Sequence, residues 1–186
     1  MIKVFRSEDE DTRGILIADG FFNWDLAESM IIDGNYNFGR TYECARRYKK
    51  HMTSVGQEWD SIDSLCRSKF LGFPYSTKSI ETFDDDGTTR GKRIVKFVDM
   101  KVNPEGFRVV IVENEFPYAL TPDIRHFIIW SCKDISLEEY LEQVEKEFPR
   151  NKFDIIIFEN PSERKSVNGV SHAQVFVRDK TGVSGA

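Results

Sequence analysis

The sequence has few cysteines, and their arrangement fits neither a disulfide framework nor a zinc site. Cys44, Cys66 and Cys132 are odd in number, and none of them belongs to a C-x-x-C motif. Disulfide-stapled domains and zinc sites both depend on paired, closely spaced cysteines. We therefore expect buried thiols in a reducing compartment, which points to the cytoplasm.

Long apolar runs and an excess of positive charge are also lacking. No run approaches the length of a membrane span, and the start MIKVFRSEDEDTRG has acids where a leader peptide has its apolar stretch. The 26 Lys and Arg residues are outnumbered by 31 Asp and Glu, for a net charge of −5. This balance argues against general nucleic-acid binding. We expect a soluble protein without a membrane partner.

Apolar and aromatic residues, by contrast, are plentiful. The chain is 40% hydrophobic over 186 residues and includes 15 Phe, which is enough for a sizeable core. In the first half, apolar residues recur at helical spacing over 23–32, 38–53 and 61–71. We expect a mainly helical segment over 1–93, with short edge strands near its start and a flexible loop at 77–93.

From residue 94 onward the pattern changes to that of β-strands. Runs of strand length occupy 94–102, 107–113, 124–132, 153–158 and 171–178, with a tight turn at 103–106. Ser136 and Glu139 form a capping box that opens a helix between the third and fourth runs. Short links favour antiparallel pairing. The predicted fold is α+β: an antiparallel five-stranded sheet with one covering helix over 94–180, followed by a tail at 181–186.

The last strand alternates between two kinds of side chain. Ser171, Ala173, Val175 and Val177 suit the helix-covered face, whereas His172, Gln174 and Phe176 fall on the other face. The loop before this strand carries Asn160, Lys165 and Ser166. An imidazole, two amides, an ammonium and a hydroxyl in one place suit the binding of a phosphate and attack on it.

Two stretches, FPYALTPDIRHFIIWS and FENPSERKSVNGVSHAQVFV, carry a family resemblance. Residues 115–177 resemble the N-acetylglucosamine-induced proteins, a domain of unknown function, whose pattern reads roughly W-P-Y-x-x-x-P-x-I-x-H-x-x-x-W and N-x-x-x-x-K-S-V-x-x-V-x-H-x-H-V. The chain departs from it at Gln174, where that family usually has a second His. More distantly, the segment is similar to the histidine-triad superfamily of nucleotide hydrolases and transferases. Pro122, His126 and the apolar run after it match the P-x-x-H-h-h-h-h strand of that superfamily.

In that superfamily the middle His of H-h-H-h-H attacks a phosphorus atom. If His172 is this residue, Val170 takes the first triad position and Gln174 the third, where the galactose-1-phosphate uridylyltransferase branch also has Gln. In a second register His172 is first and Gln174 replaces the nucleophile, which gives an inactive enzyme. The residue pattern leaves both registers open.

The resemblance implies a role for each candidate residue. His172 would be the nucleophile, with Ser166 and Lys165 holding the charge of the phosphate. Gln174 would bind a phosphate oxygen, and Asn160 would fix the loop. His126, the last substrate-binding candidate, would be structural or a wall of the pocket. The expected ligand is a nucleotide or another phosphorylated small molecule, with neither metal nor cofactor.

The incomplete triad also predicts an alternative. The same fold would then serve as a catalytically inactive module that binds a protein or a ligand through an aromatic surface. A homodimer that pairs through sheet edges or helices is a further expectation. The basic run Arg46–His51 on the second helix has two interpretations, a patch for an anion and a solvated helix face, and we favour the solvated face.

Overall fold

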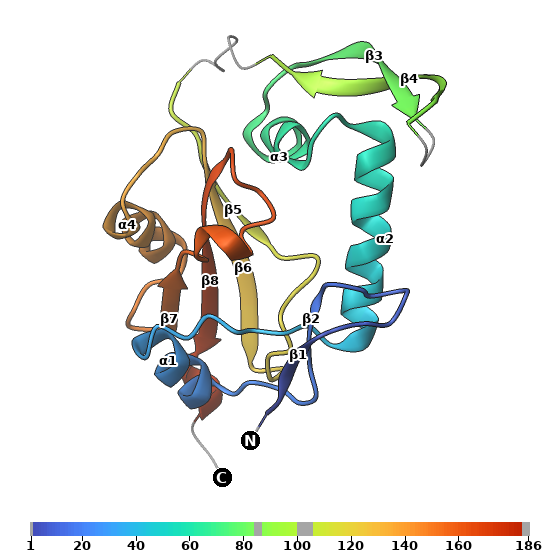
Figure 1. The fold of residues 1–186 in the computed structure, drawn as a ribbon. Helices are drawn as coiled ribbons and strands as arrows, with labels where there is room; N and C mark the ends of the chain where they lie inside the picture. The colour runs from blue at the N-terminus through green and yellow to red at the C-terminus, as the bar shows by residue number, and fades with distance from the viewer. Residues whose placement is uncertain (1, 84–86, 100–105, 184–186) are drawn as a thin grey trace.

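The central element is an antiparallel sheet of four strands in the order β5-β6-β8-β7 (Figure 1). The computed structural model describes residues 2–83, 87–99 and 106–183. The strands of this sheet are β5 (Val109–Glu113), β6 (Ile124–Ser131), β7 (Phe153–Phe158) and β8 (Ser171–Asp179). β8 lies between β6 and β7 and is buried along most of its length.

One face of the sheet packs against helix α4 (Leu137–Glu147), as the sequence predicts. The capping box forms: the Ser136 hydroxyl accepts from the Glu139 amide, and the Glu139 carboxylate accepts from the Ser136 amide. Tyr140 and Val144 pack on Ala173, Val175 and Val177, the face of β8 expected to be covered. Leu137, the first residue of the helix, is exposed, although its apolar side chain suits the core.

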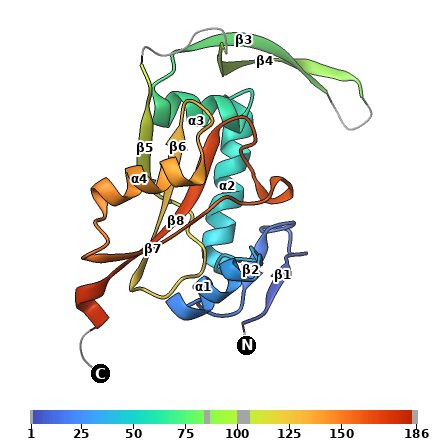
Figure 2. The ribbon, with the colours of Figure 1, turned by 90° about the vertical axis from the view of Figure 1, so that its left-hand side faces the viewer.

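Three helices from the first half of the chain lie on the other side of the sheet (Figures 1 and 2). They are α1 (Trp24–Ile32), α2 (Tyr42–Glu58) and α3 (Ile62–Leu71). Asn23 and Ser61 cap α1 and α3 through their side chains, and Gly72 ends α3 in the left-handed conformation with φ of 71°. None of the helices in the described ranges is both long enough and apolar enough to cross a bilayer.

Helix α2 starts later than its apolar pattern suggests, so the predicted start at Phe38 is wrong. Thr41 caps the helix, and Phe38 instead packs on Phe158 and Phe176 of the sheet. Gly39 explains the difference, because a Cβ there would lie 2.6 Å from the backbone of Ile17 and Ala18. The segment before α2 therefore runs against strand β2 (Leu16–Ala18), which pairs with β1 (Val4–Arg6) as a short edge ribbon.

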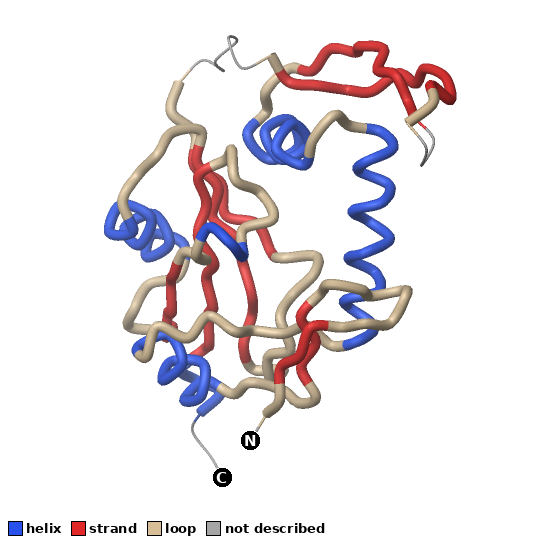
Figure 3. Tube along the Cα trace, in the orientation of Figure 1, coloured by secondary structure: helices blue, strands red, loops and turns tan. Residues whose placement is uncertain are grey.

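The five-stranded sheet is a wrong prediction, since the run at 94–102 joins a different sheet. β3 (Tyr75–Phe83) and β4 (Thr89–Val98) form a separate hairpin, so most of the loop expected at 77–93 is strand. The hairpin lies beyond α3, away from the main sheet (Figures 1 and 3). β4 pairs along its length with β3, its neighbour in the sequence. The edge of β6 that faces away from β8 pairs with β5. Most of the predicted turn at 103–106 lies outside the described residues. Two short 3₁₀ helices, η1 (Ser162–Arg164) and η2 (Lys180–Val183), complete the described elements, and η2 takes up the start of the expected tail.

Candidate functional site

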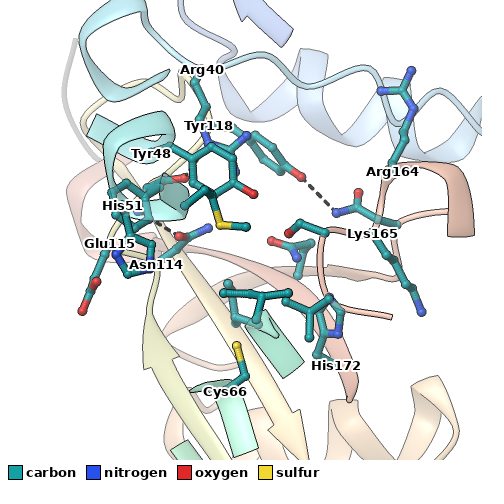
Figure 4. A pocket seen from close by; sticks show the side chains of 18 of the residues that line it. Arg40, Tyr48, His51, Cys66, Asn114, Glu115, Tyr118, Arg164, Lys165 and His172 are labelled. Carbon is teal, nitrogen blue, oxygen red and sulfur yellow. Dashed lines mark hydrogen bonds between the residues drawn. The ribbon is translucent and has the colours of Figure 1, made fainter. Parts of the chain in front are cut away.

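A cavity of about 430 Å³ lies between the face of the sheet opposite α4 and the N-terminal half of the chain (Figure 4). The open face of β5, β6 and β8 forms its floor through Val112, Ile128, Trp130, His172 and Gln174. Residues of α2 and α3 form one wall, and the loop from Asn160 to Val167 forms another. The sequence predicted His172 and Gln174 on this face and Asn160, Lys165 and Ser166 in the loop beside it, and the N-terminal half supplies the wall opposite that loop.

His172 lies on the floor with only one ring nitrogen uncommitted. Its Nδ1 is 2.8 Å from the carbonyl oxygen of Val170, to which it donates, and its ring stacks on Trp130 at a centroid distance of 4.7 Å. The side chain is 6% exposed, and this burial lowers the pKa of His172 below 6.5. The ring is therefore neutral near pH 7, and Nε2 carries its lone pair.

His126 does not appear among the described residues that line the cavity. It lies on β6 under Gln174, with its Nε2 2.8 Å from the Gln174 Oε1, and Tyr118 stacks on its ring. Burial lowers the pKa of His126 to about 3. His126 therefore holds the amide of Gln174 in place. This fits the structural role considered for His126 rather than direct contact with a ligand.

The three candidates on the loop have different surroundings. Asn160 is buried, and its Nδ2 donates to the Tyr118 hydroxyl at 3.0 Å. Lys165 forms an ion pair with Glu159 at 2.7 Å, and its ammonium points away from the middle of the cavity (Figure 4). Ser166 lines the cavity at its exposed rim. All three border the cavity, but the ammonium of Lys165 is engaged outside it.

Several polar residues of the cavity were not among the site residues predicted from the sequence, although Tyr48 and His51 belong to the run Arg46–His51 that was considered as an anion patch. Arg40, Tyr48 and His51 come from the start and middle of the N-terminal half, and Asn114 and Tyr118 follow strand β5. Tyr118 lies in the FPY stretch that was read only as part of a family pattern. Nothing in the spacing of Arg40 pairs it with His172, because their meeting depends on how the chain folds back over the sheet.

The basic run on α2 divides between surface and cavity. Arg46, Arg47, Lys49 and Lys50 are exposed, as a solvated face requires, whereas Tyr48 and His51 line the cavity. Cys66, on the facing wall, is a free thiol whose burial raises its pKa to about 12. No group of three or more His, Cys, Asp and Glu side chains that could hold a metal ion occurs within the described ranges.

Comparison with known proteins places the chain in a family but not in a function. A family model described as "Protein of unknown function (DUF3605)" matches residues 23–178. A solved structure described as the crystal structure of HTC1 superposes with a TM-score of 0.55 and is 15% identical in sequence. The match covers 84% of this chain and 85% of that one, and at this identity it shows a shared fold alone. No curated protein matches the chain.

Proposed function

The chain belongs to the DUF3605 family of proteins of unknown function, and we propose that it binds a nucleotide or another phosphorylated small molecule in the cavity beside His172. The state of His172 is the observation that carries the proposal. Its Nδ1–H is committed to the Val170 carbonyl and burial keeps its ring neutral, so Nε2 remains an uncharged nucleophile at the cavity floor.

The size and lining of the cavity support a ligand of this class. A volume of about 430 Å³ lies in the range of sites for small molecules and cofactors. Aromatic side chains enclose much of it, including Tyr48, Phe70, Phe116, Tyr118 and Trp130. Such rings suit the planar base of a nucleotide or the apolar face of a sugar. Arg40 adds a cation within the same lining.

The proposed chemistry is phosphoryl or nucleotidyl transfer through His172. The Nε2 lone pair attacks the phosphorus, a P–N bond forms, and the P–O bond to the leaving group breaks. The leaving oxygen takes a proton from water. Water or a second acceptor then attacks the phosphorus, the P–N bond breaks, and His172 regains its lone pair while the proton of the attacking group goes to solvent. With water as acceptor the sum is hydrolysis.

Resemblance to the histidine-triad superfamily is part of this proposal. The hydrogen bond from His172 to the Val170 carbonyl supports the register in which His172 is the nucleophile, Val170 is first and Gln174 is third. In the other register His172 is first, and Gln174 occupies the position of the nucleophile. Because the Gln174 amide oxygen is held by His126, the side chain suits positioning rather than attack.

A catalytically inactive binding module is the second candidate, and the position of Lys165 favours it. The ammonium that was expected to offset developing charge pairs with Glu159 instead. The ring of His172 also lies against Trp130, which covers one of its faces. Under this alternative the cavity holds its ligand without turnover.

A thermal-shift screen of mononucleotides, dinucleotides and nucleotide sugars tests binding, with wild type and His172→Asn compared. The Asn side chain can still donate to the Val170 carbonyl, but it has no counterpart of Nε2. A ligand at a hundred times its Kd stabilises the fold by about 2.7 kcal/mol, which gives a visible rise in Tm. We expect a rise in wild type that the variant weakens, and ³¹P NMR of the hit then separates turnover from binding. A well-folded wild type that no compound shifts would refute the proposal.

A further inference from the structure

The orientation of a second histidine fixes which groups the cavity floor offers to a ligand. The Nδ1 of His126 lies 3.2 Å from the backbone nitrogen of Tyr118. A backbone N–H can only donate, so Nδ1 must accept and carries the lone pair. The buried ring is neutral, because its pKa is lowered to about 3 by desolvation. The proton of His126 therefore resides on Nε2.

That proton determines how Gln174 is turned. The Nε2–H of His126 needs an acceptor, and the amide oxygen of Gln174 lies 2.8 Å away. The NH₂ group of Gln174 is thereby directed away from His126. Gln174 lines the cavity, and its NH₂ group meets no acceptor among the described residues.

A hydrogen bond from the backbone likewise fixes the orientation of the Asn114 side-chain amide. Its Oδ1 accepts from the Phe116 amide at 2.9 Å, so its Nδ2 is left as a donor. Nδ2 lies 3.4 Å from the Nε2 of His126, but both atoms carry hydrogen and cannot bond to each other. Asn114 also lines the cavity, so a second NH₂ group beside His126 lacks an acceptor in the described part of the chain.

Arg40 brings a positive charge to the same region. Its Nε donates to the Phe116 carbonyl at 3.1 Å, and its guanidinium lies over the rings of Tyr48 and Tyr118, at 4.4 and 5.3 Å from their centroids. No carboxylate of the described residues forms an ion pair with it. Two carboxylates of the cavity lining are already paired, Glu113 with Arg125 and Glu115 with Lys69.

We propose that Asn114, Gln174 and Arg40 form an oxyanion subsite that holds the phosphate of the ligand. The two amides and the guanidinium present only N–H donors, and an oxyanion is the group that accepts from all of them. Gln174 is two residues from His172 on one face of β8, a separation of about 7 Å along a strand, so the held phosphate lies beside the nucleophile. This rests on the proposed function and assigns its anion to these residues instead of Ser166 and Lys165.

Titration of ¹⁵N-labelled protein with inorganic phosphate tests the subsite directly. We expect the side-chain NH₂ signals of Asn114 and Gln174 to shift together in wild type, and acetate to shift them less because it has fewer acceptor oxygens. Asn114→Asp keeps the acceptor for the Phe116 amide, and Gln174→Glu keeps the acceptor for His126, while each removes the NH₂ group. Each should weaken phosphate binding about tenfold or more, as is usual for loss of a hydrogen bond to a charged group.

Asn151→Asp is the matched control, because it adds the same charge at an exposed position outside the cavity lining. It should leave phosphate binding unchanged. If neither NH₂ signal of folded wild type responds to phosphate, the subsite is wrong. It is also wrong if a nucleotide binds through His172 but is indifferent to Asn114→Asp and Gln174→Glu. Phosphate binding that these two variants abolish, together with a bound nucleotide that wild type does not turn over in the ³¹P NMR assay, would support the subsite and count against the proposed catalysis.

Discussion

His126 on β6 and Gln174 on β8 are diagonal neighbours on one face of the sheet, with the imidazole Nε2 2.8 Å from the amide oxygen. Both side chains are buried, and the Gln174 oxygen satisfies the Nε2–H of His126, while the His126 Nδ1 accepts from the Tyr118 amide. The pair connects the buried ring of His126 to the cavity floor. The amide oxygen of Gln174 is hydrogen-bonded to His126, and Gln174 also lines the cavity.

Gln174→Leu should destabilise the fold, because it leaves the buried Nε2–H of His126 without an acceptor. An unsatisfied buried donor costs about 1–3 kcal/mol. Gln174→Glu retains an acceptor oxygen at this place and should lose less. Urea unfolding at neutral pH measures both variants. Equal stabilities would mean that the hydrogen bond to His126 does not form.

Stability should fall as the pH is lowered below neutrality. Burial is the main cause of the lowered pKa of both His126 and His172, so each folded-state value lies below the ordinary value of 6.5. At pH values between its folded-state pKa and 6.5, each histidine binds a proton in the unfolded chain but not in the folded chain. Within this pH window each histidine lowers the free energy of unfolding by about 1.4 kcal/mol for each unit that the pH falls. For His126 this window extends from 6.5 down to about 3.

Urea unfolding of wild type and His172→Asn across pH 5 to 7 measures this loss. The variant should show the shallower dependence, because it retains only the contribution of His126. A ring proton of His126 that titrates near pH 6 in the folded protein would contradict the prediction.

Two neighbouring residues of β4 report how the hairpin packs. Val95 is 1% exposed, whereas Ile94 is 72% exposed. Val95→Ala should cost about 2 kcal/mol of unfolding free energy, because it removes buried methyl groups and leaves a void. Ile94→Thr should change it by less than about 0.5 kcal/mol, as surface substitutions usually do. A large effect at Ile94 would indicate that this side of the hairpin is covered, as in the five-stranded sheet that the sequence suggested.

Gly39→Ala should be among the more harmful small substitutions. The added Cβ would lie 2.6 Å from backbone atoms of β2, which cannot rotate away as a side chain can. Overpacking of this kind costs about 1–3 kcal/mol. Because Arg40 follows directly, phosphate binding should weaken as well.

Gly56→Ala is the matched control, since Gly56 lies within α2 and a Cβ there meets nothing within 4 Å. It should stabilise the protein by about 0.5–1 kcal/mol. Thermal unfolding of the two variants side by side tests both signs. A neutral Gly39→Ala would contradict the close approach of the chain to β2.

Most local structure was predictable from the sequence, because its causes are local. The capping box at Ser136 and Glu139 forms as predicted, and α1 and α3 lie within the ranges 23–32 and 61–71 that the helical spacing indicates. The alternation along β8 correctly divides the strand between α4 and the cavity. The choice of partner for β4 was not predictable, because a strand pattern does not say which free edge it will join.

The candidate site shows the same division. By itself the sequence determined that His172 and Gln174 share one face of β8 and that Asn160, Lys165 and Ser166 precede it, since these relations follow from strand period and chain order. Only the tertiary structure decided that Lys165 pairs with Glu159, that His126 fixes the amide of Gln174, and that Arg40 reaches the same cavity. Hydrogen bonds and charges act over a few ångströms, so they depend on residues that are distant in sequence and neighbours only in the fold.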